Sequence, residues 1–197
     1  MLFRSIWKAK VDGSSRMLHN TLTLGWLAKD LHQAPRLAPD GSFWIAVSYR
    51  NLDGNPNSAN NICTNLWKVS PDGSQWTALT SYSTSGEDAL DPAISPDSSK
   101  VAFSRKTVSP TRPFNLYQIT ISSGTVTQLT SETDADMHSI EPAWNPGGTK
   151  LVYASRKALS GSSANPSYNL WVYTFSGSSS TALTTDSASG NDHRQPQ

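Results

Sequence analysis

A proline-headed phrase recurs along this chain of 197 residues, and its spacing limits the fold more than any other feature. From Pro35 to Pro92, Pro142 and Pro196 the steps are 57, 50 and 54 residues. A second phrase reads Asn-Leu-aromatic and ends in Leu-Thr, and its copies start at Asn65, Asn115 and Asn169. A unit that returns at this interval indicates a repeat architecture, in which neighbouring units bury each other's faces.

One copy of the first phrase, DPAISPDSSKVAFSR at 91–105, shows what a unit contains. Two short apolar segments flank a Pro-Asp-Ser-Ser sequence, in which proline fixes φ and the aspartate can bond its own downstream backbone. This pattern predicts a β-hairpin, and the second phrase predicts another. The consecutive apolar residues of 100–104 and 150–155 predict strands that are buried on both faces. Each unit is therefore expected to be four strands, with no helix.

Four-stranded units that are buried on both faces predict an all-β fold, a β-propeller of four-stranded antiparallel blades. We expect one propeller domain over 1–197, with whole blades at about 33–80, 90–130 and 140–184. A partial blade at 1–24 and the start of another at 193–197 indicate an incomplete domain. A small ring, or a ring completed by several copies of the chain as a homo-oligomer, is the alternative.

The repeated phrase resembles the WD40-like PD40 repeat of TolB-type β-propellers. One copy is carried by Pro92, Ser95, Pro96, Asp97, Val101, Ala102 and Phe103, then Asn115, Leu116, Tyr117, Leu129 and Thr130. The next is carried by Pro142, Trp144, Pro146, Leu151, Val152 and Tyr153, then Asn169, Leu170, Trp171, Leu183 and Thr184. This next copy has Asn145-Pro146-Gly147-Gly148 at its turn and lacks the aspartate. The resemblance implies a larger ring, typically of six blades, a protein or peptide partner, and a periplasmic or extracellular setting.

Composition excludes several other functions. Charged residues are 16% of the chain and the formal net charge is +1, so no basic field exists to hold nucleic acid. No apolar run approaches the ~20 residues of a membrane-spanning helix, and the N-terminal residues as given carry no signal peptide. Cys63 is the one cysteine, which excludes an intrachain disulfide.

Candidate ligand-binding residues stand in the segment before each phrase-opening proline. They are Asp30, His32, Asp88, Asp91, Asp136, His138, Glu141, Asp192 and His193. In a propeller these segments converge at the channel mouth, where carboxylates and imidazoles can hold a basic or hydroxylated ligand. No cofactor is predicted, although the same groups leave a Ca²⁺ site open. The alternative is structural: Asp and His would cap turns and bond the backbone of the neighbouring blade.

The sequence contains no Gly-x-Ser-x-Gly elbow and no His-Glu-x-x-His metal signature. We therefore favour a non-catalytic protein-binding or scaffolding propeller that resembles TolB. A fragment of a polysaccharide-active enzyme or lectin is one alternative, with Trp26, Trp44 or Trp76 as a platform for carbohydrate. The gating propeller of a prolyl-oligopeptidase-like peptidase is another. Trp7, Trp67 and Trp171 occupy equivalent strand positions and are expected in the core.

Overall fold

A computed structural model describes residues 7–9, 16–18, 32–50, 52, 63–108, 113–160 and 164–196. Over these residues the chain forms strands and turns, with no helix, in three four-stranded antiparallel sheets and one two-stranded hairpin. The all-β propeller architecture predicted from the repeats is thus confirmed. No helix among these residues is long and apolar enough to span a membrane.

The hairpin and the first sheet come from the first 78 residues. The hairpin pairs β1 (Trp7–Ala9) with β2 (Arg16–Leu18). The first sheet has the order β3 (His32–Leu37), β4 (Trp44–Ser48), β5 (Asn65–Val69) and β6 (Trp76–Ala78). Each strand pairs with the next in the chain, as a meander of hairpins requires.

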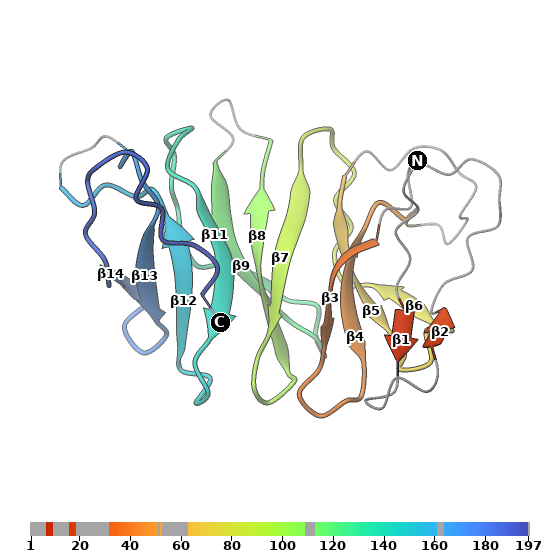
Figure 1. Ribbon diagram of the computed structural model, residues 1–197. Helices are drawn as coiled ribbons and strands as arrows, with labels where there is room; N and C mark the ends of the chain where they lie inside the picture. Colours follow the sequence, from red (N-terminus) through yellow and green to blue (C-terminus); the bar gives the residue numbers. More distant parts are fainter. Residues whose placement is uncertain are drawn as a thin grey trace.

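The second and third sheets repeat this topology. The second contains β7 (Asp88–Ile94), β8 (Lys100–Lys106), β9 (Phe114–Thr120) and β10 (Val126–Gln128). The third contains β11 (Ser139–Trp144), β12 (Lys150–Ser155), β13 (Asn169–Thr174) and β14 (Ser179–Ala182). Figure 1 shows the three sheets following one another across the molecule, and the first strand of the second sheet contacts the first strands of both others.

Apolar side chains from neighbouring sheets form the core. Between the first and second sheets, Ile45 and Val47 pack with Val101 and Phe103, and all four are fully buried. Between the second and third sheets, Ala102 and Leu116 pack with Leu151, Tyr153 and Trp171. Successive residues of β8 therefore point into different cores, which confirms the prediction of burial on both faces. Since each buried Val, Leu, Ile or Phe contributes about 1.5–3 kcal/mol, the sheets depend on one another for their stability.

The Asn-Leu-aromatic phrase holds the second half of each sheet through one buried asparagine. In the second sheet Asn115 Oδ1 accepts hydrogen bonds from Thr130 Oγ1 at 3.0 Å and from the Glu132 amide at 2.6 Å. Its Nδ2 donates to the Glu132 carbonyl at 3.0 Å. The same bonds join Asn65 to Thr80 and Asn169 to Thr184. The Asn and the closing Thr recur together because each side chain satisfies the buried polar groups of the other.

The Ser-Pro-Asp turns are held by their own side chains. In the β7–β8 turn Ser95 Oγ donates to Asp97 Oδ1 at 2.6 Å, and the Ser99 amide donates to the same oxygen at 3.1 Å. These hydrogen bonds favour the ionised carboxylate and lower the pKa of Asp97 to about 2. Asp72 makes the same bonds in the β5–β6 turn. The recurring motif is therefore a local turn signal, as predicted.

Candidate functional site

The first strands of the three sheets line a groove of about 920 Å³. Figure 1 shows the end of the described chain crossing in front of β11, where Gln195 and Pro196 form part of the groove wall. The other lining residues come from equivalent positions of β3, β7 and β11 and from the turns that follow them. The groove is therefore the surface on which the proline-headed phrases converge.

Each of these three strands is interrupted by a bulge at its x-Pro dipeptide. The pairing shifts between Gln33 and Arg36, between Leu90 and Ala93, and between Ile140 and Ala143. The residue before the proline is left-handed in each bulge and also before Pro196, with φ of 45° at Ala34, 51° at Asp91, 56° at Glu141 and 58° at Gln195. Such a φ costs a non-glycine residue about 1–2 kcal/mol, and four repeats carry it.

The bulge directs the amide of the pre-proline residue toward the preceding repeat. The Gln195 amide donates to Glu141 Oε2 at 2.8 Å. The Glu141 amide donates to Ser104 Oγ at 3.2 Å and also to the Asp91 carboxylate. The strained conformation is thus compensated by hydrogen bonds that pass from one sheet to the next. Because the strand continues through the bulge, Asp91 and Glu141 lie within β7 and β11, and not in the preceding loops where we predicted them.

Asp91 is half-buried and belongs to this series of hydrogen bonds between sheets. Burial raises the pKa of its carboxyl, and the negative charge of Glu141 acts in the same direction. The hydrogen bond from Ser104 Oγ, at 2.9 Å, opposes the increase, as does the Arg194 guanidinium. Ser104 itself is fully buried, and both hydrogen-bonding functions of its hydroxyl are used in holding Asp91 and the Glu141 amide.

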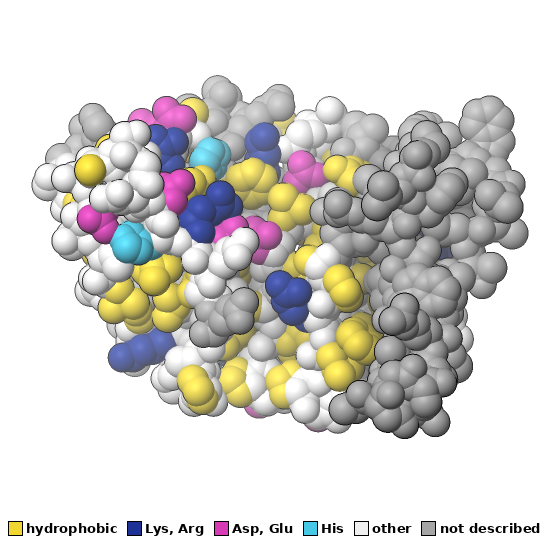
Figure 2. Space-filling model, in the orientation of Figure 1, with side chains coloured by type: hydrophobic (Ala, Val, Ile, Leu, Met, Phe, Trp, Pro, Cys, Tyr) yellow, Lys and Arg dark blue, Asp and Glu magenta, His cyan; other side chains and the backbone are white. Residues whose placement is uncertain are grey.

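Glu141 is paired on the groove side. Arg194 Nη2 donates to its Oε1 at 2.6 Å, and the side-chain exposure is 43% for Arg194 and 18% for Glu141. Figure 2 shows acidic and basic side chains directly beside each other over the part of this face that β11 occupies. The two predicted carboxylates that line the groove, Asp91 and Glu141, are therefore engaged by groups of the chain itself.

Arg36, unlike Arg194, has no carboxylate partner among the described residues. Its guanidinium is exposed on β3 and donates to the Pro35 carbonyl at 3.3 Å. The adjacent Leu37 side chain is 48% exposed. The lower half of the face in Figure 2 likewise shows basic and hydrophobic side chains side by side.

Apolar residues recur along the groove at the ends of β3, β7 and β11. In each repeat a hydrophobic residue is followed two positions later by a proline of the turn. The groove is lined by all three pairs, Leu37 with Pro39, Ile94 with Pro96, and Trp144 with Pro146. The groove therefore offers an apolar rim at one end and charged groups further along the strands.

Three of the other predicted site residues bond the backbone just before an Asn-Leu-aromatic strand, and two of them, Asp88 and His138, do so from the start of the next sheet. Each accepts a hydrogen bond from the backbone amide of the residue just before the repeated asparagine, which is Asn65, Asn115 or Asn169. Thr64 donates to Asp88 at 3.0 Å, Phe114 to His138 Nδ1 at 3.1 Å, and Tyr168 to Asp192 at 2.9 Å. The donor and acceptor are separated by 24 residues in every case. This arrangement is the structural alternative that the sequence analysis left open.

His138 is the one imidazole in this series. Burial lowers its pKa, the Arg156 charge acts in the same direction, and Asp136 opposes them. Since Nδ1 accepts the Phe114 amide, the neutral ring is the form that makes the junction. The Phe114 ring packs against it with the centroids 5.7 Å apart.

The remaining predicted residues that the structure describes are not part of the groove lining. Asp136 is exposed, and its amide bonds to Asp134 Oδ1 at 2.9 Å. The His193 ring makes a close hydrogen-bonding contact with the Asp186 carboxylate, and its amide donates to the Tyr168 carbonyl at 2.9 Å. His32 is the first residue of β3, and Asp30 lies outside the described residues. Within the described part of the chain, no three His, Cys, Asp or Glu side chains gather as a metal site.

Sequence reasoning missed Ser104, Arg194 and Arg36. Ser104 is opposite Leu90 in the β7–β8 register, a relation that no local pattern discloses. Arg194 reaches Glu141 across 53 residues of sequence. The sequence did contain one indication that Arg36 is unusual. It directly follows the phrase-opening proline, a position that alanine occupies in the next two repeats.

Neither a family model nor a curated protein sequence matches the chain. Solved structures do. TolB from Acinetobacter baumannii has a TM-score of 0.65 at 18% identity, covering 92% of this chain and 37% of TolB. An oligogalacturonate lyase from Vibrio parahaemolyticus has a TM-score of 0.62 at 16% identity, covering 97% of this chain and 45% of the lyase.

A puromycin-hydrolyzing peptidase from Mycobacterium tuberculosis has a TM-score of 0.59 at 13% identity, covering 87% of this chain and 23% of the peptidase. The chain therefore spans less than half the length of each of these three proteins. At such identities the likeness concerns the fold alone, and the fold is that of a TolB-like β-propeller.

Proposed function

Taking the TolB-like β-propeller fold as the premise, we propose that this chain is a non-catalytic binding module that takes a segment of a partner protein in the groove. The observation that carries the proposal is the exposed pair Arg36 and Leu37 on β3, a cation without a carboxylate partner among the described residues beside an exposed apolar side chain. Arginine is enriched among the residues that dominate binding energy at protein interfaces, and the exposed Leu37 beside it adds apolar surface that a partner can bury.

The charges of the groove support an acidic partner over a basic one. Glu141 is paired with Arg194 and with the Gln195 amide, and Asp91 is bonded by Ser104. These carboxylates would have to lose existing partners before they accepted a new cation. Arg36 would lose only a bond to its own neighbour's carbonyl, at 3.3 Å. Complementary charge at an exposed rim contributes mainly to the association rate and to specificity.

The fold likeness also leads us to propose a periplasmic or extracellular setting, which fractionation of the source cells with an antibody against the chain would test. A homo-oligomer that completes the ring is a further proposal, and light scattering of the purified chain measures its mass directly. A mass of one chain would contradict the homo-oligomer.

An array of random 12-residue peptides tests the function. We expect bound peptides to be rich in Asp and Glu, with affinity that falls roughly two- to fivefold in Arg36→Gln, as for the loss of one exposed ion pair. Lys150→Gln is the matched control, since Lys150 is an exposed cation outside the groove lining. If no peptide binds more tightly than about 1 mM, or if both variants lose affinity equally, the proposed function is wrong.

A further inference from the structure

A second hollow, of about 380 Å³, opens between the β7–β8 turn and the β11–β12 turn. Both turns lie at the lower end of Figure 1. The hollow, called here the Trp144 hollow, is lined by Ser95, Pro96, Asp97, Lys100, Trp144 and Pro146, with Gly147 and Gly148. Gly148 has a φ of 66°, and a Cβ there would lie 3.7 Å from Pro96 Cδ, which shows how closely the two turns approach.

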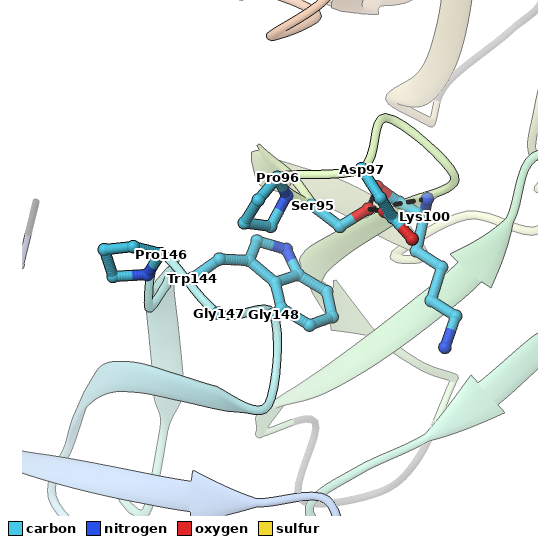
Figure 3. Close-up of a pocket in the computed structure, with 8 residues that line it drawn as sticks. All are labelled: Ser95, Pro96, Asp97, Lys100, Trp144, Pro146, Gly147 and Gly148. Atoms are coloured by element: carbon cyan, nitrogen blue, oxygen red, sulfur yellow. Dashed lines mark hydrogen bonds between the residues drawn. The ribbon is translucent and has the colours of Figure 1, made fainter.

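The rings of Trp144, Pro96 and Pro146 give the Trp144 hollow an apolar part, and the indole is held in place. The Trp144 indole stacks on Phe175, with centroids 5.1 Å apart and an interplanar angle of 7°. Its Nε1 donates to the Ala93 carbonyl of the neighbouring sheet at 3.0 Å. Figure 3 shows the indole beneath the Pro96 ring, with Pro146 to the left of it. The anchored indole and the two proline rings lose little conformational freedom when a ligand binds. The entropy cost of ordering these side chains around an apolar ligand group is therefore small.

The polar groups of the hollow are satisfied, with one exception. Asp97 accepts hydrogen bonds from Ser95 and Ser99, and the Trp144 N–H is used by Ala93. Lys100 differs: no carboxylate of the described residues pairs with its ammonium group. In Figure 3 the Lys100 side chain extends away from the hydrogen-bonded turn. Asp97 and Lys100 thus bring opposite charges to the hollow, but the Asp97 carboxylate is engaged by its own turn, so the Lys100 ammonium group is the charge open to a ligand.

We propose that the Trp144 hollow is a second docking point, which binds an acidic peptide segment of a partner protein. An apolar side chain of that segment packs against Trp144 and Pro96, and a neighbouring Asp or Glu pairs with Lys100. The proposal rests on the proposed function, because Pro96, Trp144 and Pro146 line both the hollow and the groove, so that one segment can contact both.

The same observations favour a peptide over a carbohydrate. A bound sugar presents several hydroxyl groups, each of which needs a hydrogen-bonding partner when it is buried. The Ser95 and Asp97 side chains already bond each other, and the two prolines offer no side-chain donor or acceptor. One ammonium group and an aromatic wall match a carboxylate beside an apolar side chain.

The test uses the peptide array on five forms of the chain: wild type, Arg36→Gln, Lys100→Gln, Trp144→Ala and Lys150→Gln. Lys150 is the first residue of β12, as Lys100 is of β8, so it provides the same substitution one repeat later. We expect wild type to select peptides with an apolar residue beside Asp or Glu. Lys100→Gln should weaken them roughly two- to fivefold, and Lys150→Gln should leave them unchanged. Trp144→Ala should weaken them about tenfold or more.

Three outcomes would overturn the proposal. If the bound peptides lose affinity in Arg36→Gln but not in Lys100→Gln, the hollow is not a docking point and the groove alone is the docking site. An array without any binder refutes the groove and the hollow together. If no peptide binds, but digalacturonic acid binds to wild type and is weakened in Lys100→Gln, the hollow is a carbohydrate site. Because Lys100 is partly exposed at the start of a strand, Lys100→Gln keeps the test decisive even if Trp144→Ala fails to fold.

Discussion

Replacing His138 tests directly how the sheets are joined. Alanine at this position removes the nitrogen that accepts the Phe114 amide at 3.1 Å and the ring that packs against Phe114. An unpartnered buried amide costs about 1–3 kcal/mol, and the loss of a ring contact adds about 0.5–1.5 kcal/mol. His138→Ala should therefore lower the free energy of unfolding by about 2–4 kcal/mol, measured by urea denaturation at pH 7.5.

Aspartate is the informative replacement, because Asp88 and Asp192 make the equivalent bond in the other repeats. His138→Asp should restore the acceptor and recover about half of the loss, since the ring contact stays absent. If His138→Asp is as unstable as His138→Ala, or if His138→Ala costs less than about 1 kcal/mol, the interpretation of these residues as sheet junctions is refuted.

The pH dependence gives the same prediction an independent check. Burial, with the Arg156 charge, lowers the pKa of His138, so between that pKa and the ordinary value of 6.5 the unfolded chain binds more protons than the folded chain. The stabilisation is complete above pH 6.5 and is lost as the pH falls toward the lowered pKa, by at most about 1.4 kcal/mol per pH unit. The advantage of wild type over His138→Asp should therefore shrink from pH 7.5 to 5.5. A constant difference would contradict the reasoning.

Three further predictions concern the turns and the groove. Asn115→Ala should lower the free energy of unfolding by about 2–4 kcal/mol, because three hydrogen bonds are lost. The control is Thr127→Ala at an exposed position, which should change this free energy by about 0.5 kcal/mol or less. If the two variants unfold at similar urea concentrations, the role of Asn115 is disproved. Ser104→Ala should raise the pKa of Asp91 further, because the hydroxyl stabilises the charged carboxylate; a carboxyl ¹³C NMR titration that shows no change would exclude this. Calcium at about 5 mM should leave the melting temperature unchanged, and a rise that chelator reverses would reveal a metal site that the described residues do not form.

The turns and hairpins could be predicted because their interactions are local. Asp97 bonds Ser95 and Ser99, each two residues away, so the residues that form the turn also stand together in the sequence. The Asn115 and Thr130 pair lies 15 residues apart but within one hairpin, and its recurrence in every unit makes it visible. Local chemistry and repetition together were enough to predict the fold.

The candidate site could be predicted only in part. Asp88 and Asp91 precede the same proline, yet Asp88 bonds the Thr64 amide of the preceding sheet while Asp91 lines the groove. They are three positions apart, and only Asp91 lies in the bulge, with its left-handed φ of 51°. Nothing in the local sequence distinguishes an aspartate that joins sheets from one that lines a groove, because the partners come from other repeats.

By itself the sequence determined the four-stranded unit, its turns, its repetition and the burial of strands on both faces, since these follow from side chains close together in the chain. The tertiary structure alone decided which repeats meet and through which atoms. Glu141 meets Arg194 across 53 residues, and the Trp144 indole reaches Ala93 across 51. Such contacts exist only after whole sheets have packed side by side, because no local hydrogen bond or turn preference specifies which side chains packing brings together.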